Sequence, residues 1–273
     1  MQILYLSIAG FIIKLVFHRS SDKQNKVTPE RFCKEIFLHN EGFIIDFEPS
    51  STDFIIEFLE AKGFDIYESP KKKGFIHFYS PVAYNHISTF YHISRVQFIY
   101  LLKSAVGQLL SKTGFVMHCS ANLVNGEAAI YIGESGIGKT TLVSMLKKEY
   151  PILADDEGYI KQEGEAFYFY QGPFLERDYN FSKTYKRYAI STIFILEQGN
   201  ACQISQPTTD EIRRVSLQLI SAQSQLSETR NLLSALESTV PLQKIIFTKR
   251  KKELMDCVLN HPPFNNTPCL NTK

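Results

Sequence analysis

Residues 133–140 combine glycines, a lysine and a hydroxyl in the pattern GxxxxGK[ST], the Walker A pattern of a P-loop. The glycines let the backbone curl so that successive N–H groups point at an anion, and a following helix adds the positive end of its dipole. Lys139 would lie against the β- and γ-phosphates of a nucleoside triphosphate, and the Thr140 hydroxyl would bind Mg²⁺. The predicted phosphate-binding residues are Gly133, Glu134, Ser135, Gly136, Ile137, Gly138, Lys139, Thr140 and Thr141.

The segments on either side of this loop have the arrangement that a P-loop requires. Residues 128–132 are apolar and predict a strand, and residues 141–146 begin an apolar-periodic helix. Strand, loop and helix in this order favour a phosphate-binding loop over a flexible glycine-rich turn.

Two adjacent acids follow the predicted helix. Pro151 ends that helix, and residues 152–154 form a short apolar strand with Asp155 and Asp156 at its carboxyl end. In open α/β sheets this edge binds ligands. One acid would hold a metal ion and the other would accept a proton from an attacking hydroxyl, with either acid a candidate for the base. Asp155 and Thr140 are the candidate metal ligands, and the alternative is a plain surface turn.

A histidine is placed near the loop by strand register. Asn125-Gly126 between apolar runs predicts a two-residue hairpin. If Val124 pairs with Glu127, His118 lies opposite Gly133, and a slip of one residue would break this match. An imidazole there would tune the proton acceptor or contact a phosphate, so the candidate catalytic residues are His118, Lys139, Asp155 and Asp156. The alternative is a structural histidine.

The rest of the chain predicts a mixed α/β protein in which a smaller N-terminal module precedes the catalytic domain. The apolar run 3–17 is short and contains Lys14, which favours strands over an export or membrane segment. Further strands are expected at 43–47, 64–67, 75–79, 188–196 and 242–247, and helices at 52–61, 95–112, 208–237 and 249–259. The expected domains are residues 1–94, 95–260 and a disordered tail, 261–273.

Composition narrows the class of protein. The chain has 273 residues, with 30 basic and 28 acidic side chains and 44% hydrophobic residues, which is typical of a globular protein. The near-zero charge balance excludes a strongly cationic nucleic-acid coat, and we expect no nucleic-acid or membrane partner. Five scattered cysteines without metal-ligand spacing indicate free thiols and a cytoplasmic protein.

The order of these residues resembles the catalytic domain of the HPr kinase/phosphorylase family. The likeness rests on Met117-His118, the hairpin, the 133–140 loop and Ala154-Asp155-Asp156. It implies a P-loop kinase core related in fold to phosphoenolpyruvate carboxykinase, with ATP and Mg²⁺ as cofactors. It also implies that His118, Asp155 and Asp156 are catalytic, with one acid acting as the base toward a serine hydroxyl. The resemblance is compatible with a homo-oligomer, for which the residues give no interface signal.

One family feature is missing. The chain has no equivalent of the second, glycine-rich signature with its metal-binding glutamate, and residues 172–177 occupy that region. Glu176 and Arg177 are weak candidates for metal and phosphate contacts. The size of the chain and its N-terminal module are more similar to stand-alone HPr kinase-like proteins, some of which resemble kinases for lasso-peptide precursors.

Three functions follow as hypotheses. The leading one is an ATP-dependent kinase that phosphorylates a hydroxyl of a peptide, a protein or a small serine-like alcohol. The alternative is a catalytically weak nucleotide-binding regulatory protein, which fits the missing second signature. A third is a simple NTPase switch, which would hydrolyse nucleotide without an acceptor.

Overall fold

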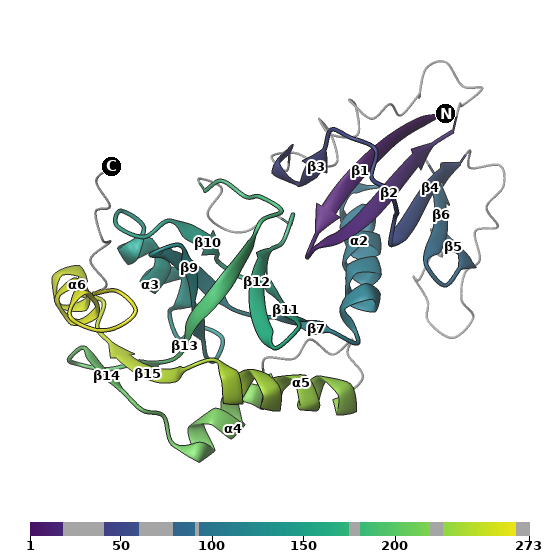
Figure 1. The fold of residues 1–273 in the computed structure, drawn as a ribbon. Coiled ribbons are helices and arrows are strands. Elements are labelled where there is room, and N and C mark those ends of the chain that lie inside the picture. Colours follow the sequence, from purple (N-terminus) through teal and green to yellow (C-terminus); the bar gives the residue numbers. More distant parts are fainter. Residues whose placement is uncertain (19–40, 60–78, 91–92, 175–180, 219–225, 266–273) are drawn as a thin grey trace, which may run out of the picture. The chain divides into compact units, whose positions relative to one another are not determined.

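The computed structural model describes residues 1–18, 41–59, 79–90, 93–174, 181–218 and 226–265 (Figure 1). The chain divides into two compact units, Met1–Leu109 and Leu110–Lys273. Helix α2 (Arg95–Leu110) falls within the first unit except for its last residue, whereas the boundary expected from the sequence lay before this helix, at residue 95.

The first unit is a six-stranded sheet with helix α2 packed against one face. Phe98 of α2 contacts Phe58 of the sheet, with ring centroids 6.2 Å apart. The apolar N-terminal run forms strands, as predicted, and these pair as a hairpin in which Gln2 lies opposite Phe17. In the order β3-β1-β2-β4-β6-β5, the strands are Ile44–Ile45, Gln2–Ile8, Phe11–Phe17, Phe54–Leu59, His86–Phe90 and Tyr79–Ala83.

The predicted helix at 52–61 is wrong, because residues Phe54–Leu59 form strand β4. Alternate side chains of β4 are buried, and the strand lies between parallel neighbours β2 and β6. The expected strand at 43–47 is reduced to a 3-10 turn, Glu41–Phe43, followed by β3. The predicted strand at 64–67 lies outside the described residues.

The second unit is built on three parallel strands, β9 (Glu127–Ile132), β13 (Arg187–Gln198) and β15 (Leu242–Phe247). Their carboxyl ends meet at one edge of the sheet. The remaining strands are β7 (Gly114–Met117), β8 (Ser120–Val124), β10 (Ile152–Ala154), β11 (Gly158–Glu163), β12 (Ala166–Gln171) and β14 (Gln203–Ser205). The predicted strands at 188–196 and 242–247 are confirmed.

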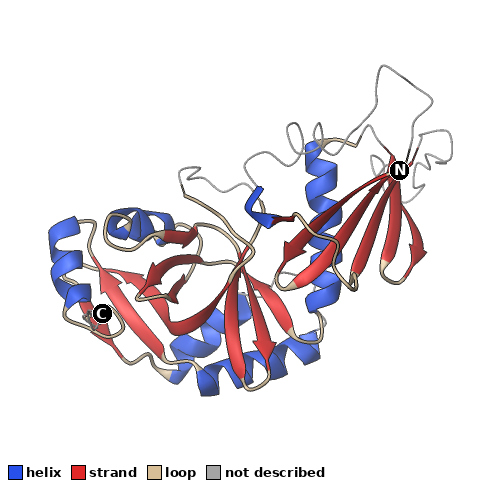
Figure 2. Ribbon diagram, turned by 45° about the horizontal axis from the view of Figure 1, so that its top comes forward, coloured by secondary structure: helices blue, strands red, loops and turns tan. Residues whose placement is uncertain are grey.

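Helices cover both faces of this sheet (Figure 2). Apolar side chains of α5 (Leu226–Thr239) join one core cluster with Ile130. Those of α3 (Lys139–Leu146) and α6 (Lys251–Leu259) join a second cluster with Tyr131, the next residue of the same strand. Neighbouring residues of β9 thus point into cores on opposite faces. Helix α4 (Thr209–Gln218) occupies part of the predicted 208–237 helix.

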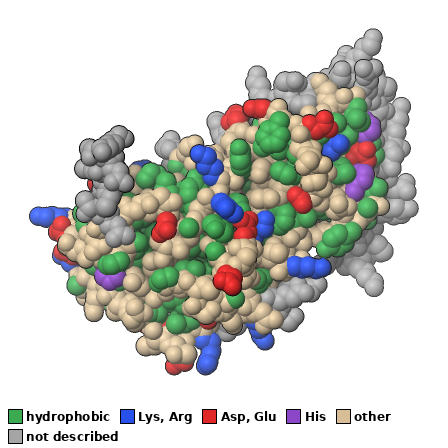
Figure 3. Space-filling model, in the orientation of Figure 1, with side chains coloured by type: hydrophobic (Ala, Val, Ile, Leu, Met, Phe, Trp, Pro, Cys, Tyr) green, Lys and Arg blue, Asp and Glu red, His purple; other side chains and the backbone are tan. Residues whose placement is uncertain are grey.

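Both units are mixed α/β, as the sequence predicts. On the face shown in Figure 3, basic and acidic side chains are dispersed among hydrophobic and other residues, in keeping with the small net charge. Within the described ranges, the structure contains no helix that is both long and apolar enough to cross a membrane.

The strand pairs β7–β11 and β8–β10 follow one another in one antiparallel ribbon, with residues 118–119 and 155–157 between the two pairs. Met117 of β7 pairs with Gly158 of β11, and Ala121 of β8 pairs with Ala154 of β10, in the same register. Between these pairs, the Cys119 N–H donates to the Asp156 carbonyl over 3.2 Å. The ribbon therefore brings residue 118 close to the two acids, although 37 positions or more separate them in the chain.

The predicted disorder from His261 onward is wrong for residues 261–265. Phe264 is buried against the core of the second unit, with its ring edge-on to Tyr150 at 5.2 Å between centroids. The Tyr150 hydroxyl donates to the Phe264 carbonyl over 3.3 Å. Apolar burial therefore fixes this part of the C-terminal segment, while residues 266–273 lie outside the described residues.

Candidate functional site

The 133–140 loop runs from the carboxyl end of β9 to the first turn of α3, as predicted. Gly136 and Gly138 have φ angles of 81° and 107°, which L-amino acids with side chains rarely adopt. The Gln198 side chain, at the end of β13, donates to the Ile137 carbonyl over 2.7 Å. Backbone conformation and a neighbouring strand therefore both hold the curl of the loop.

Gly138 also lies against the end of β15. A Cβ atom at this position would meet the Phe247 ring at 2.9 Å, closer than real Cβ contacts allow. This position therefore needs glycine for two independent reasons, its left-handed backbone and its close approach to an aromatic ring.

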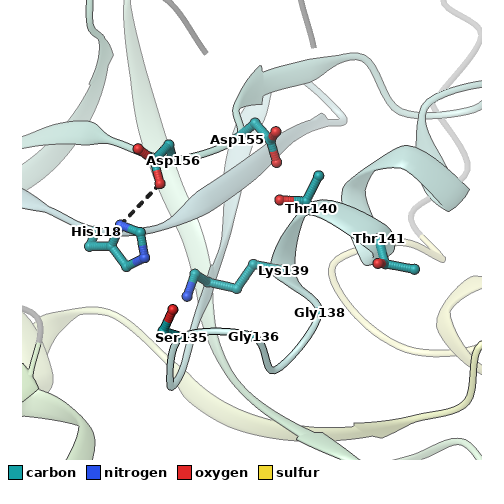
Figure 4. Close-up of a pocket in the computed structure, with 9 residues that line it drawn as sticks. All are labelled: His118, Ser135, Gly136, Gly138, Lys139, Thr140, Thr141, Asp155 and Asp156. Carbon is teal, nitrogen blue, oxygen red and sulfur yellow. Dashed lines mark ion pairs between the residues drawn. The ribbon is translucent and has the colours of Figure 1, made fainter. Parts of the chain in front are cut away.

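A polar pocket of about 210 Å³ opens beside the loop (Figure 4). Its lining consists of His118, Ser135, Gly136, Gly138, Lys139, Thr140, Thr141, Asp155 and Asp156, all of which the sequence singled out. Of the other three predicted loop residues, Gly133 and Glu134 accept hydrogen bonds from Lys139 through their carbonyls, and Ile137 packs against the core. The structure thus gathers the loop, the histidine and both acids at one place.

The two acids occupy different environments. Asp155 is buried, with 3% of its surface exposed, and Figure 4 shows its carboxylate directed toward Thr140. The Asp156 side chain is 58% exposed, and its Oδ1 lies 3.3 Å from Nδ1 of His118. Asp155 therefore suits a fixed ligand role, whereas Asp156 is accessible to a molecule arriving from solvent.

The backbone of both acids is fastened to the segment that carries His118. The buried Ser120 hydroxyl donates to the Asp155 carbonyl over 2.9 Å, and the Cys119 N–H bonds the Asp156 carbonyl. The predicted hairpin register is confirmed by the pairing of Val124 with Glu127. Strand β8 begins at Ser120, however, so the ladder ends before a pair between residues 118 and 133 would form. His118 instead meets Asp156 across the ribbon.

Lys139 is held at the base of the pocket with 7% of its surface exposed. Its Nζ donates to the carbonyls of Gly133 and Glu134 over 2.9 and 3.3 Å. Burial lowers the pKa of this lysine, and the nearby negative charge of Asp156 acts in the opposite direction. The lysine is therefore a partly desolvated cation beside the loop amides. A bound phosphate would replace the electrostatic stabilisation that the ammonium group loses when it is removed from water.

The residues present fit a magnesium nucleotide. The Thr140 hydroxyl and the Asp155 carboxylate supply hard oxygen ligands on the same side of the loop. In the part of the chain that the structure describes, no group of three or more His, Cys, Asp or Glu side chains forms a metal cage. Mg²⁺ typically takes one or two protein oxygens and completes its shell with phosphates and water, so this sparse set suffices.

Sequence reasoning missed the residues that support the site through the backbone. Ser120, Gln198 and Phe247 carry no motif, and their partners become apparent only when distant strands are adjacent. The weak candidates Glu176 and Arg177 lie outside the described residues.

A family match to known proteins includes this region of the chain. Residues 101–193, about a third of the chain, match the family model of phosphoenolpyruvate carboxykinase. The structure of the Hpr(Ser) kinase/phosphatase from Coxiella burnetii matches with 11% identity over 34% of this chain and 72% of that one, but with a TM-score of 0.26. No curated protein sequence matches the chain. The family match covers His118, the loop and both acids, so this part of the chain is similar to an ATP-using, kinase-like P-loop family.

Proposed function

We propose that the protein is an ATP-dependent kinase that transfers the γ-phosphoryl group of ATP to a hydroxyl, either a serine of a peptide or protein or a small serine-like alcohol. The observation that carries this proposal is the His118–Asp156 pair at 3.3 Å in the same pocket as the P-loop. A P-loop alone would only bind nucleotide. An accessible carboxylate beside an imidazole adds the proton acceptor that transfer to a hydroxyl requires.

The loop and Lys139 bind the triphosphate. The amides of residues 133–140 contact the β- and γ-phosphates, and Lys139 exchanges its bonds with the Gly133 and Glu134 carbonyls for phosphate oxygens. Thr140 and Asp155 would hold Mg²⁺, which neutralises charge on the phosphates when it is bound. The buried position of Asp155 makes it the better ligand of the two acids.

Asp156 takes the proton from the acceptor hydroxyl. Its exposed carboxylate reaches solvent, where an acceptor arrives, and His118 orients the carboxylate through their contact. The hydroxyl oxygen then attacks the γ-phosphorus, and its proton passes to an Asp156 oxygen. The bond between the γ-phosphorus and the β–γ bridging oxygen breaks, and ADP leaves. Because phosphoryl transfer needs little covalent participation by the protein, rate enhancement comes mainly from positioning and electrostatic stabilisation.

Incubation with γ-labelled ATP and a panel of serine-containing peptides and small alcohols tests the proposal. We expect labelled phosphate on at least one acceptor, with the transfer lost when Asp156 is replaced by asparagine. If ATP binds but no acceptor is labelled, the result favours a nucleotide-binding regulatory protein, to which the missing second signature also points. Rapid hydrolysis without an acceptor would instead indicate an NTPase switch.

Nucleotide binding is expected to take up a proton at alkaline pH. Burial lowers the pKa of Lys139 in the ligand-free protein from its usual 10.5, and phosphate oxygens favour the ammonium form. Between the lowered and the usual pKa, the lysine therefore gains a proton on binding, and ATP affinity falls as pH rises through the lowered value. Calorimetry in two buffers of different ionisation enthalpy measures this uptake. The Lys139→Arg variant is the control, because its guanidinium stays charged. Equal uptake in both proteins would contradict the assignment.

A further inference from the structure

Gln171, the last residue of β12, is a buried side chain that joins three backbone groups of the second unit. Its surface is 1% exposed. Its Nε2 donates to the carbonyls of Leu153 over 2.8 Å and Ser182 over 3.4 Å. Its Oε1 accepts from the Thr184 N–H over 3.0 Å. One amide thus connects β10 with the chain segment 182–184.

The Leu153 carbonyl lies where the ladder between β10 and β8 is irregular. Ile152 pairs with Asn122 and Ala154 with Ala121, so Leu153 is an extra residue that has no pairing partner on β8. Such a bulge frees backbone groups from the ladder and redirects the side chains that follow, and bulges are common beside active sites. Asp155 and Asp156 come directly after this irregularity. The hydrogen bond from Gln171 occupies the carbonyl that the bulge releases.

The other end of the Gln171 amide has a firm anchor. Lys183, between its two partners, donates through Nζ to the carbonyls of Gly172 and Phe174 over 3.0 and 2.5 Å. The segment 182–184 is therefore tied back to the end of β12, next to Gln171 itself. A shift of the bulge would have to break the buried bond to the Leu153 carbonyl or the partly buried bonds that hold the amide at segment 182–184.

We infer that Gln171 is a positioning residue for the phosphoryl transfer, because it fixes the bulge at Leu153 and with it the direction of the Asp155 and Asp156 carboxylates. The inference rests on the proposed kinase function. Gln171 acts through the backbone of β10, and the pocket lining does not include it. Its loss should therefore leave the nucleotide loop intact and displace the acids.

Asn122, on the neighbouring strand β8, offers a matched control. It is also a fully buried amide, and its Nδ2 donates to the carbonyls of Tyr150 over 2.8 Å and Pro151 over 3.4 Å, just before β10 begins. Gln171→Met and Asn122→Leu each remove a buried amide that bonds backbone carbonyls around β10. Only the first releases the bulge directly before the acids.

Three measurements on the full chain decide the matter. They are thermal unfolding, Mn²⁺ binding to the complex with the ATP analogue adenylyl imidodiphosphate by electron paramagnetic resonance, and steady-state transfer of phosphate from γ-labelled ATP to the best acceptor of the panel described above. For Gln171→Met we expect an unchanged KM for ATP, a kcat about 10–100-fold lower, and Mn²⁺ binding about 10-fold weaker. For Asn122→Leu we expect a lower unfolding temperature with kcat and Mn²⁺ affinity as in the wild type.

The outcomes separate this inference from the function on which it rests. If folded Gln171→Met keeps the wild-type kcat and Mn²⁺ affinity, or if Asn122→Leu loses as much of both, the positioning role is wrong while the kinase proposal stands. If the wild-type protein binds neither ATP nor the analogue, the proposed function itself fails. Should Gln171→Met not fold, Gln171→Glu decides by the same measurements. Its carboxyl group keeps an acceptor for the Thr184 N–H and, at a pH at which it is ionised, has no donor for the Leu153 carbonyl, so the measurements are made at such a pH.

Discussion

Replacing Asp156 with asparagine is expected to slow phosphoryl transfer by about 10²–10⁴-fold, the usual contribution of a general base. The asparagine keeps the shape of the side chain but cannot accept the hydroxyl proton. Because the Asp156 side chain is exposed and contacts His118, the change should disturb neither the loop nor the core. Single-turnover transfer from γ-labelled ATP measures the rate, and calorimetry should show ATP affinity close to that of the wild type.

Asp210→Asn provides the control for this substitution. Asp210 is an exposed aspartate on α4 whose nearest cation is Arg213 at 3.9 Å, and it does not line the pocket. We expect it to transfer phosphate at the wild-type rate. Transfer by Asp156→Asn at a similar rate would instead exclude Asp156 as the base and shift support to the regulatory alternative.

Gly138→Ala is expected to weaken binding of magnesium ATP by about 10–100-fold, since left-handed backbone costs an L-residue about 1–2 kcal/mol and steric overlap adds to this. The φ angle of 107° disfavours alanine, and its Cβ would lie 2.9 Å from the Phe247 ring. To relieve both strains, the loop must uncurl, which turns its amides away from the phosphates. Titration calorimetry with saturating Mg²⁺ measures the affinity.

Gly164→Ala is the matched control for the loop glycine. Gly164 has a φ of 64° in the turn between β11 and β12, and open space surrounds the position of its Cβ. We expect a loss of about 1–2 kcal/mol in stability with unchanged ATP affinity. If Gly138→Ala bound ATP as tightly as Gly164→Ala, the curled loop described here would not be the conformation that binds nucleotide.

The phosphate loop and the acids could be predicted because the information is local. Residues 133–140 are consecutive, and the acids directly end the next short strand, so spacing alone places them at one sheet edge. The position of His118 near the loop could also be predicted, because the Asn125-Gly126 turn fixes which residues of the hairpin pair. The contact between His118 and Asp156 depends on pairing across the ribbon, which no short-range pattern specifies.

Strand β4 shows why other parts of the fold could not be predicted. Its residues have the length and apolar content of a short helix. The strand conformation is favoured by its neighbours: Ile55 and Glu57 pair with residues of β2 and β6 that lie about 30–40 positions away. Tertiary context therefore overrides the local preference.

The residues that support the site could not be predicted from the sequence for the same reason. Gln171 has an ordinary sequence environment at the end of a strand, and its partners lie 11–18 positions away in the chain, before and after it. The role of a buried glutamine can be inferred only when the carbonyl that accepts its hydrogen bond is known. Phe247 likewise restricts residue 138 from a strand that is more than a hundred positions distant.

The shared register of Met117–Gly158 and Ala121–Ala154 has a consequence for how this architecture can change over time. The distance between the His118 imidazole and the Asp156 carboxylate depends on this one register. Inserting or deleting a single residue in either strand would therefore move its side chains to the opposite face. Lengthening the turn at 125–126 leaves that ladder intact. Changes of length are therefore tolerated in this turn, whereas the imidazole and the carboxylate keep their relative position only if both strands keep their length.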